Sequence, residues 1–149
     1  MKISFKGDYA LKIILDLALT YNQGLTQIKE ISRRQDIPEK FLEQIVTFLK
    51  SARYIKTTRG PKGGIGLTKH PSQITVGEIV RVVEGPTSPI ACVSCSGYLR
   101  CGFEEKCVFK TMWAEVRNSV NDIVDKTTFQ HMADRHRALI LKEIPDYSI

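Results

Sequence analysis

Two short helices followed at once by a glycine-rich hairpin are the feature that most restricts the fold of this chain. Apolar residues recur at helical spacing over residues 27–34 and again over residues 39–52. The break between them is short, and Pro38 suits the first turn of the second helix. Residues 56–68 then place β-branched residues on both sides of a Gly/Pro turn, which predicts a two-stranded hairpin. A helix-turn-helix followed by a hairpin predicts a winged helix.

Further helices flank this unit. Residues 8–21 carry a broad apolar face, and Thr75 caps a short amphipathic helix that ends at residue 84. Thr26 is likewise expected to cap the helix that starts after it. Residues 108–132 are expected to form one helix about 37 Å long, because apolar residues recur there in steps of three and four. Its apolar face either packs on its own domain or, as we favour, meets a partner helix in a homodimer.

Positive charge is concentrated in the hairpin and the helix before it. No Asp or Glu occurs between Gln44 and Gly77, and that interval holds six Lys or Arg residues, which equal the formal net charge of +6. Such a basic block suits the phosphate backbone of double-stranded DNA. A basic surface that only contacts solvent is the alternative.

A winged helix brings the start of its second helix toward base edges. Gln44 can pair with adenine, and Glu43 can accept a hydrogen bond from cytosine N4. Arg59 in the hairpin suits a narrow minor groove, whereas Lys56 and Lys62 are expected on phosphates. The predicted DNA-binding residues are therefore Lys40, Glu43, Gln44, Lys56, Arg59 and Lys62.

The expected fold is mainly α, a winged helix-turn-helix DNA-binding domain with a small β-hairpin wing and a long C-terminal dimerisation helix. The expected division is a winged-helix domain over residues 1–85, a cysteine-rich loop over 86–107, the dimerisation helix over 108–132 and a tail over 133–149. The tail can fold back as a final short helix. We call residues 86–107 the cysteine loop.

All four cysteines lie in this loop, as Cys92, Cys95, Cys101 and Cys107, with the pattern C-x2-C-x5-C-x5-C. Such a set can hold an iron–sulfur cluster, bind zinc or form disulfides. No secretory signal and no segment of membrane-spanning length is visible, so we expect a cytoplasmic protein with reduced thiols. A metal centre is therefore favoured over disulfides.

Enzymatic activity is not expected, because the sequence offers no nucleophile–base pair or carboxylate dyad in a recognisable context. An iron–sulfur electron carrier would use the same cysteines. It would not need the basic block or the wing, and salt-dependent binding to duplex DNA separates the two functions.

Five segments occur in an order typical of one protein family. They are KGDYAL at 6–11, FLEQI at 41–45, RGPKGG at 59–64, ITVGEI at 74–79, and the cysteine array with Trp113 six residues after it. Together they resemble the iron–sulfur cluster regulator (IscR) family of bacterial winged-helix transcription regulators. That family also includes nitric-oxide-sensing repressors and cysteine-metabolism repressors.

The resemblance implies a homodimer that grips a palindromic operator with two winged helices. It also implies a [2Fe-2S] or [4Fe-4S] cluster on three cysteines that match Cys95, Cys101 and Cys107. The fourth ligand of the iron–sulfur cluster regulators is a His at the position of Lys110, and a protonated Lys has no lone pair to give. In nitric-oxide-sensing members it is an Asp of the other subunit, at the position of Asp8.

Two residues therefore compete for the fourth ligand position. Cys92 offers a soft thiolate on the same loop and is favoured. Asp8 of the partner subunit is the alternative, and its other interpretation is an N-cap of the first helix.

We expect a transcription regulator, a repressor, whose operator binding is controlled by an iron–sulfur cluster that senses redox state, nitric oxide or iron–sulfur status. Ligation would fix the loop between the winged helix and the dimerisation helix, and with it the spacing of the two recognition helices. A metal-free thiol-redox or metabolite-responsive repressor of the same fold is the alternative.

Overall fold

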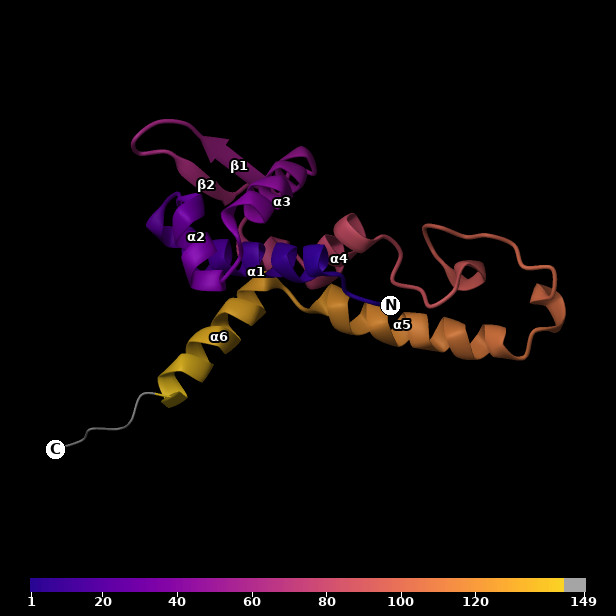
Figure 1. Ribbon diagram of the computed structural model, residues 1–149. Coiled ribbons are helices and arrows are strands. Elements are labelled where there is room, and N and C mark those ends of the chain that lie inside the picture. The colour runs from indigo at the N-terminus through magenta and orange to yellow at the C-terminus, as the bar shows by residue number, and fades with distance from the viewer. Residues whose placement is uncertain (144–149) are drawn as a thin grey trace.

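The structure, a computed structural model, describes residues 1–143 and confirms a mainly helical fold with one antiparallel hairpin (Figure 1). The helices are α1 (Phe5–Leu19), α2 (Ile28–Gln35), α3 (Glu39–Ser51), α4 (Val76–Glu84), α5 (Phe109–Lys126) and α6 (Phe129–Glu143). Strands β1 (Ile55–Thr58) and β2 (Gly64–Leu67) pair with Ile55 opposite Leu67. Along the described part of the chain, no helix combines the length and apolar character needed to cross a membrane.

Helix α1 forms the centre of the winged-helix domain and packs against α2, α3, α4 and α6. Its inward face is fully buried at Ala10, Ile13 and Ile14. The helix begins before the predicted residue 8, because Ser4 Oγ accepts a hydrogen bond of 3.1 Å from Gly7 N and so caps it. Asp8 consequently lies inside the first turn, and its interpretation as the N-cap is wrong.

A buried carboxylate joins α1 to α2. Asp16 is 2% exposed and accepts hydrogen bonds from Arg34 Nε at 3.0 Å and from Arg34 Nη2 at 2.7 Å. Gln35 Nε2 donates a third bond of 3.0 Å to the same carboxylate. A buried charge is tolerated only when it is paired and hydrogen-bonded, as here. The contact holds the helix-turn-helix against the central helix.

Thr26 does not cap α2, contrary to the prediction. Helix α2 begins at Ile28, and its N-cap Gln27 makes no side-chain cap hydrogen bond. Thr26 instead exchanges two backbone hydrogen bonds with Ile65, of 2.9 and 2.8 Å, and so adds a short third segment beside β2. Gly64 permits this approach, because a Cβ there would lie 2.7 Å from the Thr26 carbonyl oxygen. The base of the wing is therefore tied to the start of the helix-turn-helix.

The predicted single helix over residues 108–132 is wrong, because the chain bends between α5 and α6 (Figure 1). Thr127 O accepts a hydrogen bond of 2.8 Å from Val76 N, and Phe129 N donates one of 2.9 Å to Ile74 O. This pairing pulls two residues into extended backbone. Phe129 is 2% exposed and enters the core, so α6 turns back along α1 while α5 extends away from it. The tail is helical up to Glu143, as the end of α6, but its residues 137–143 are exposed and project away from the winged helix instead of folding back on it (Figure 1). Residues 144–149 lie outside the described part.

Candidate nucleic-acid interface and cysteine loop

Helix α3 has one buried face and one exposed face. Leu42, Ile45 and Leu49 point into the core. The opposite side carries the predicted base-reading residues Lys40, Glu43 and Gln44, all exposed. The spacing of apolar residues therefore predicted the outward face of α3 correctly.

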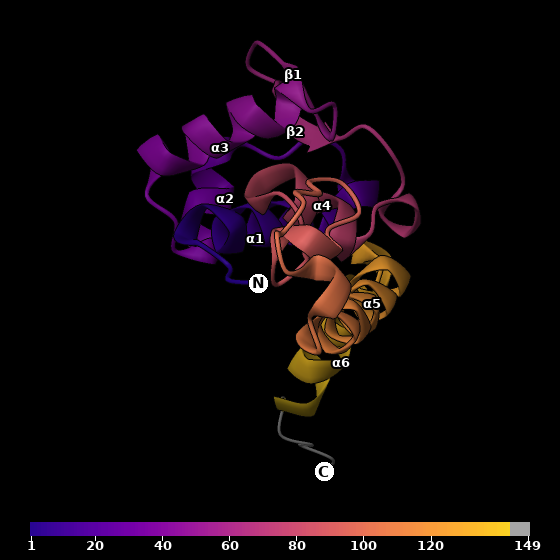
Figure 2. The same ribbon diagram turned by 90° about the vertical axis from the view of Figure 1, so that its right-hand side faces the viewer.

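The wing presents the other three predicted residues. Lys56 lies on β1, and Arg59 and Lys62 lie in the turn between the strands; all three are exposed. Gly60 allows the tight turn with its φ of 110°. Figures 1 and 2 show α3 and the hairpin together at one end of the molecule, away from α5 and α6. The six predicted residues thus stand on one exposed end, and their contact with DNA stays a prediction.

An apolar groove beside α3 was not predicted. Phe5, Tyr9, Phe41 and Phe48 line a cavity of about 640 Å³ between α1 and α3. Phe41 is 54% exposed and Phe5 is 83% exposed. Two aromatic residues outside the buried face of their helices are the sequence signal for such a surface.

The cysteine loop contains little regular structure. It forms two 3₁₀ turns, Ala91–Val93 and Glu104–Lys106, between α4 and α5. All four cysteines are free: Cys92 and Cys107 are half-buried, and Cys95 and Cys101 are exposed. Within residues 1–143, no three His, Cys, Asp or Glu side chains lie together as a ready-made metal site. The four predicted cysteine ligands therefore lie on one loop, but their side chains are not gathered around a common point.

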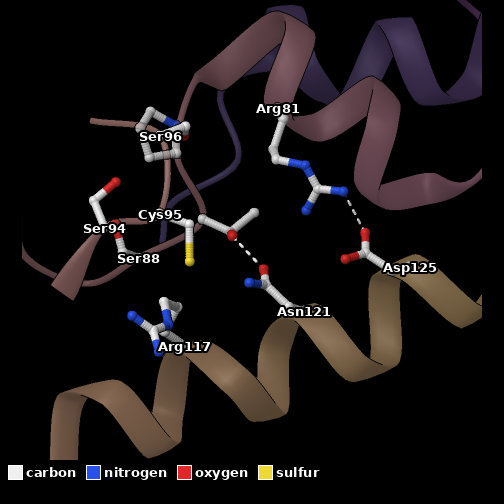
Figure 3. A pocket seen from close by; sticks show the side chains of 10 residues that line it. Arg81, Ser88, Ser94, Cys95, Ser96, Arg117, Asn121 and Asp125 are labelled. Carbon is white, nitrogen blue, oxygen red and sulfur yellow. Dashed lines mark hydrogen bonds and ion pairs between the residues drawn. The ribbon is translucent and has the colours of Figure 1, made fainter. Parts of the chain in front are cut away.

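Cys95 lines a cavity between the cysteine loop, α4 and α5 (Figure 3). The cavity measures about 340 Å³. Arg81 of α4 forms an ion pair with Asp125 of α5, and Thr87 donates a hydrogen bond to Asn121 (Figure 3). The first contact joins α4 to α5, and the second anchors the start of the cysteine loop to α5. Neither was predicted from the sequence.

The other end of the loop is held by a smaller polar network. Glu104 forms an ion pair with Lys110 and accepts a hydrogen bond of 2.7 Å from Tyr98 Oη. The hydrogen bond from Lys110 lowers the pKa of Glu104, and the same bond raises the pKa of Lys110. Cys101 lies in the wall of the shallow pocket that these residues surround. Lys110 is thus engaged as a cation beside the predicted ligands.

Asp8, the alternative ligand, lies on the exposed side of α1. Its carboxylate pairs with Lys12 at 2.7 Å, one turn later in the helix. That hydrogen bond raises the pKa of Lys12. The contact is a surface ion pair between side chains that are both nearly half exposed, which a stronger partner can replace.

Two glycines set close contacts that the sequence motifs contained but did not explain. A Cβ on Gly7 would lie 2.0 Å from Glu84 Oε1, and a Cβ on Gly77 would lie 2.0 Å from Asp125 Oδ1. Glu84 accepts hydrogen bonds from Ser4 N at 2.8 Å and from Ser4 Oγ at 2.6 Å. The sequence signal exists only for Gly77, a glycine inside a helical pattern, which often marks a close packing contact; Gly7 lies just before the helix predicted over residues 8–21.

Known proteins share this arrangement along nearly the whole chain. Residues 3–135 match the Rrf2 family, described as an iron-dependent transcriptional regulator. The HTH-type transcriptional regulator CymR of Bacillus subtilis is 36% identical over 133 residues, which cover 89% of this chain and 90% of that protein. The structure of CymR, the global cysteine regulator of B. subtilis, has a TM-score of 0.78 at 35% identity and covers 91% of this chain and 98% of its own.

Two further structures are similar. T. potens IscR has a TM-score of 0.70 at 30% identity and covers 100% of this chain and 92% of its own. Staphylococcus aureus CymR in its oxidized form has a TM-score of 0.70 at 32% identity and covers 89% and 96%. The winged-helix fold and the resemblance to IscR-type regulators are confirmed by these matches. This chain therefore belongs to the Rrf2 family of transcriptional regulators.

Proposed function

We propose that the chain is a repressor that binds a palindromic operator as a homodimer, and that an iron–sulfur cluster on the cysteine loop controls this binding. One observation carries the proposal: four free cysteines lie on the segment that joins α4 of the winged helix to α5. Whatever orders that segment changes how the winged helix is held relative to α5. The protein therefore has a means to couple sulfur chemistry to DNA binding.

Operator recognition begins at α3. Gln44 pairs with an adenine edge, and Glu43 accepts a hydrogen bond from cytosine N4. A carboxylate that faced only phosphates would be repelled by them, so Glu43 is better explained as a base-reading residue. Lys40 lies beside these two residues on the exposed side of α3, Arg59 enters the minor groove from the wing, and Lys56 and Lys62 bind phosphates. The exposure of all six side chains supports these roles.

The homodimer is supported by apolar side chains that the monomer leaves uncovered. No residue of α5 is fully buried, and Ile123 is 67% exposed. Phe109, Met112 and Val116 are also exposed on the same helix. Packing α5 against its copy would remove this surface from water, with a stabilisation of roughly 25 cal/mol for each Å² of apolar area buried.

The donor set fits an iron–sulfur cluster better than a hard metal ion. Cys95, Cys101 and Cys107 supply three soft thiolates, and Cys92 supplies a fourth, with Asp8 of the partner subunit as the alternative. A bound cluster supplies iron that responds to redox state, nitric oxide or iron–sulfur status. The chain's own contribution is a loop without α-helix or strand, which can gather the four sulfurs while its two ends stay anchored through Thr87 and Lys110.

Anaerobic purification tests the cluster directly. We expect visible absorption from thiolate-ligated iron, with iron and acid-labile sulfide present together. Cys92→Ala and Asp8→Ala then identify the fourth ligand. The residue whose replacement leaves the cluster intact is not the ligand. A colourless protein that contains stoichiometric zinc would exclude the cluster.

A metal-free thiol-redox repressor is the second candidate. It is favoured by the exposure of Cys95 and Cys101 and by the similarity to CymR, of which one structure is an oxidized form. In that case the purified protein would contain no iron, and mild oxidation would change its DNA affinity. The iron and sulfide assay separates the two candidates.

A further inference from the structure

Arg53 holds a left-handed backbone conformation directly after the recognition helix, with a φ of 66°. Residues with a Cβ disfavour this region, and bulky residues rarely adopt it. Among the non-glycine residues of the described part, only Asp36 and Arg53 have positive φ. Asp36 has a short polar side chain of the type that tolerates the conformation. An arginine is the unexpected residue at such a position.

Backbone contacts show how the conformation is held. Tyr54 N donates to Leu49 O at 3.0 Å, and Arg53 N donates to Lys50 O at 3.0 Å. This pattern is a Schellman motif that ends α3, with Arg53 at the left-handed position where glycine is the usual residue. Thr68 Oγ1 adds a hydrogen bond of 2.6 Å to the Arg53 carbonyl oxygen. The backbone alone would therefore favour glycine, and the arginine side chain needs another explanation.

Arg53 is exposed, and backbone contacts bring two further cations close to it: Arg53 N donates to Lys50 O, and Thr68, the residue before Lys69, donates to Arg53 O. Lys50 lies in the last turn of α3, and Lys69 follows β2; both are exposed. Lys69 Nζ lies 5.7 Å from the ring of Tyr54, the neighbour of Arg53. Along residues 1–143, none of these three cations forms an ion pair. A cluster of unpaired cations is stabilised by an anion that binds across it.

We propose that Arg53, together with Lys50 and Lys69, binds the phosphate backbone of duplex DNA at the end of α3. The inference rests on the proposed function, because it takes α3 and the wing as the DNA-facing side. Arg53 lies in the turn between α3 and β1, Lys50 in the last turn of α3, and Lys69 just after β2, so the three cations border one end of the hairpin. A guanidinium can hold a phosphate through two parallel hydrogen bonds, which explains arginine at a turn that favours glycine. The contact positions the recognition helix and carries no sequence preference.

Arg53→Gly is the decisive variant, because it keeps the left-handed turn and removes the charge. The probe is a fluorescent duplex of arbitrary sequence, about 30 base pairs long, titrated at several salt concentrations. We expect the affinity to fall roughly tenfold at low salt, and the slope of log K against log salt to become shallower by about 0.9 for each arginine removed. The thermal midpoint should stay unchanged or rise by up to about 4 °C, because the strained residue is gone.

Two controls complete the test. Arg53→Lys keeps the charge and should retain the wild-type salt slope. Lys142→Gln removes one charge from α6, far from the hairpin in Figure 1, and should change neither affinity nor slope. An Arg53→Gly protein with wild-type affinity and slope would overturn the inference.

The wing separates this outcome from a failure of the proposed function. If Arg59→Ala and Lys62→Ala weaken binding while Arg53→Gly does not, the phosphate site is wrong and the DNA interface stands. If wild-type protein fails to bind any duplex, the proposed DNA interface itself fails and this inference fails with it.

Discussion

Lys110 forms an ion pair with Glu104 at the end of the cysteine loop, at the position where the resemblance to IscR implies a histidine ligand. Glu104 also accepts a hydrogen bond from Tyr98, so three side chains from both sides of Cys101 meet. The pKa of Lys110 is raised by its hydrogen bond to Glu104, which keeps the ammonium charged. This cation holds the loop and has no lone pair for iron.

Replacing Lys110 should loosen the loop without unfolding the protein. Lys110→Met removes the ion pair, and we expect amide hydrogen exchange over residues 98–106 to accelerate roughly two- to fivefold, because a partly exposed pair stabilises weakly. The matched control is Arg100→Met, since the Arg100–Glu105 pair is longer, at 3.5 Å, and far more exposed. Equal exchange in Lys110→Met and wild type would show that the pair does not order the loop.

The buried Asp16 carboxylate should make Arg34 important for stability. Arg34→Ala removes two of its three hydrogen bonds and leaves a buried charge, so we expect a loss of about 2–3 kcal/mol in the free energy of unfolding. Chemical denaturation at neutral pH measures it. Arg33→Ala, at an exposed position on the same helix, should change stability by no more than about 0.5 kcal/mol. Equal stability of the two variants would contradict the assigned role.

Gly77 should be required for the contact between α4 and α5. Gly77→Ala places a Cβ against the Asp125 carboxylate, which forces the Arg81–Asp125 ion pair apart. We expect a loss of about 1–3 kcal/mol in stability, as for other overpacked sites. Gly102→Ala is the control, because a Cβ there meets nothing within 4 Å. If the Gly77→Ala and Gly102→Ala proteins had the same free energy of unfolding, α5 would be able to move aside for the added Cβ without loss of stability, and the prediction would be wrong.

Glu84 should contribute to acid sensitivity. The hydrogen bond from Ser4 Oγ, and then that from Ser4 N, lowers the pKa of Glu84 below its usual value of 4.5. A carboxyl group whose pKa is lowered by folding stabilises the protein above its unfolded pKa, and this contribution is lost as the pH falls through the folded pKa. Glu84→Gln should therefore be less stable than wild type at neutral pH and lose less stability on acidification. Parallel pH profiles for the two proteins would contradict this assignment.

Local patterns predicted the winged helix, because helical spacing around Leu42 and Leu49 and turn chemistry around Gly60 are properties of neighbouring residues. The bend after α5 was missed because its cause is distant: Thr127 and Phe129 pair with backbone near Ile74. The anchors at Gly7 and Gly77 were missed for the same reason. Periodicity predicted which side chains are exposed on α3, but it carries no information on where four cysteines lie in an irregular loop.

Cluster binding on the cysteine loop should control the affinity of the protein for DNA. The most direct test of this control uses a duplex that the protein selects from a random pool, titrated at one salt concentration with anaerobic protein before and after iron is removed by a chelator. We expect the two affinities to differ by about 5–150-fold, the range of a coupling of about 1–3 kcal/mol, and Cys101→Ala to abolish the difference. Equal affinities for the iron-containing and iron-free protein would contradict this expectation.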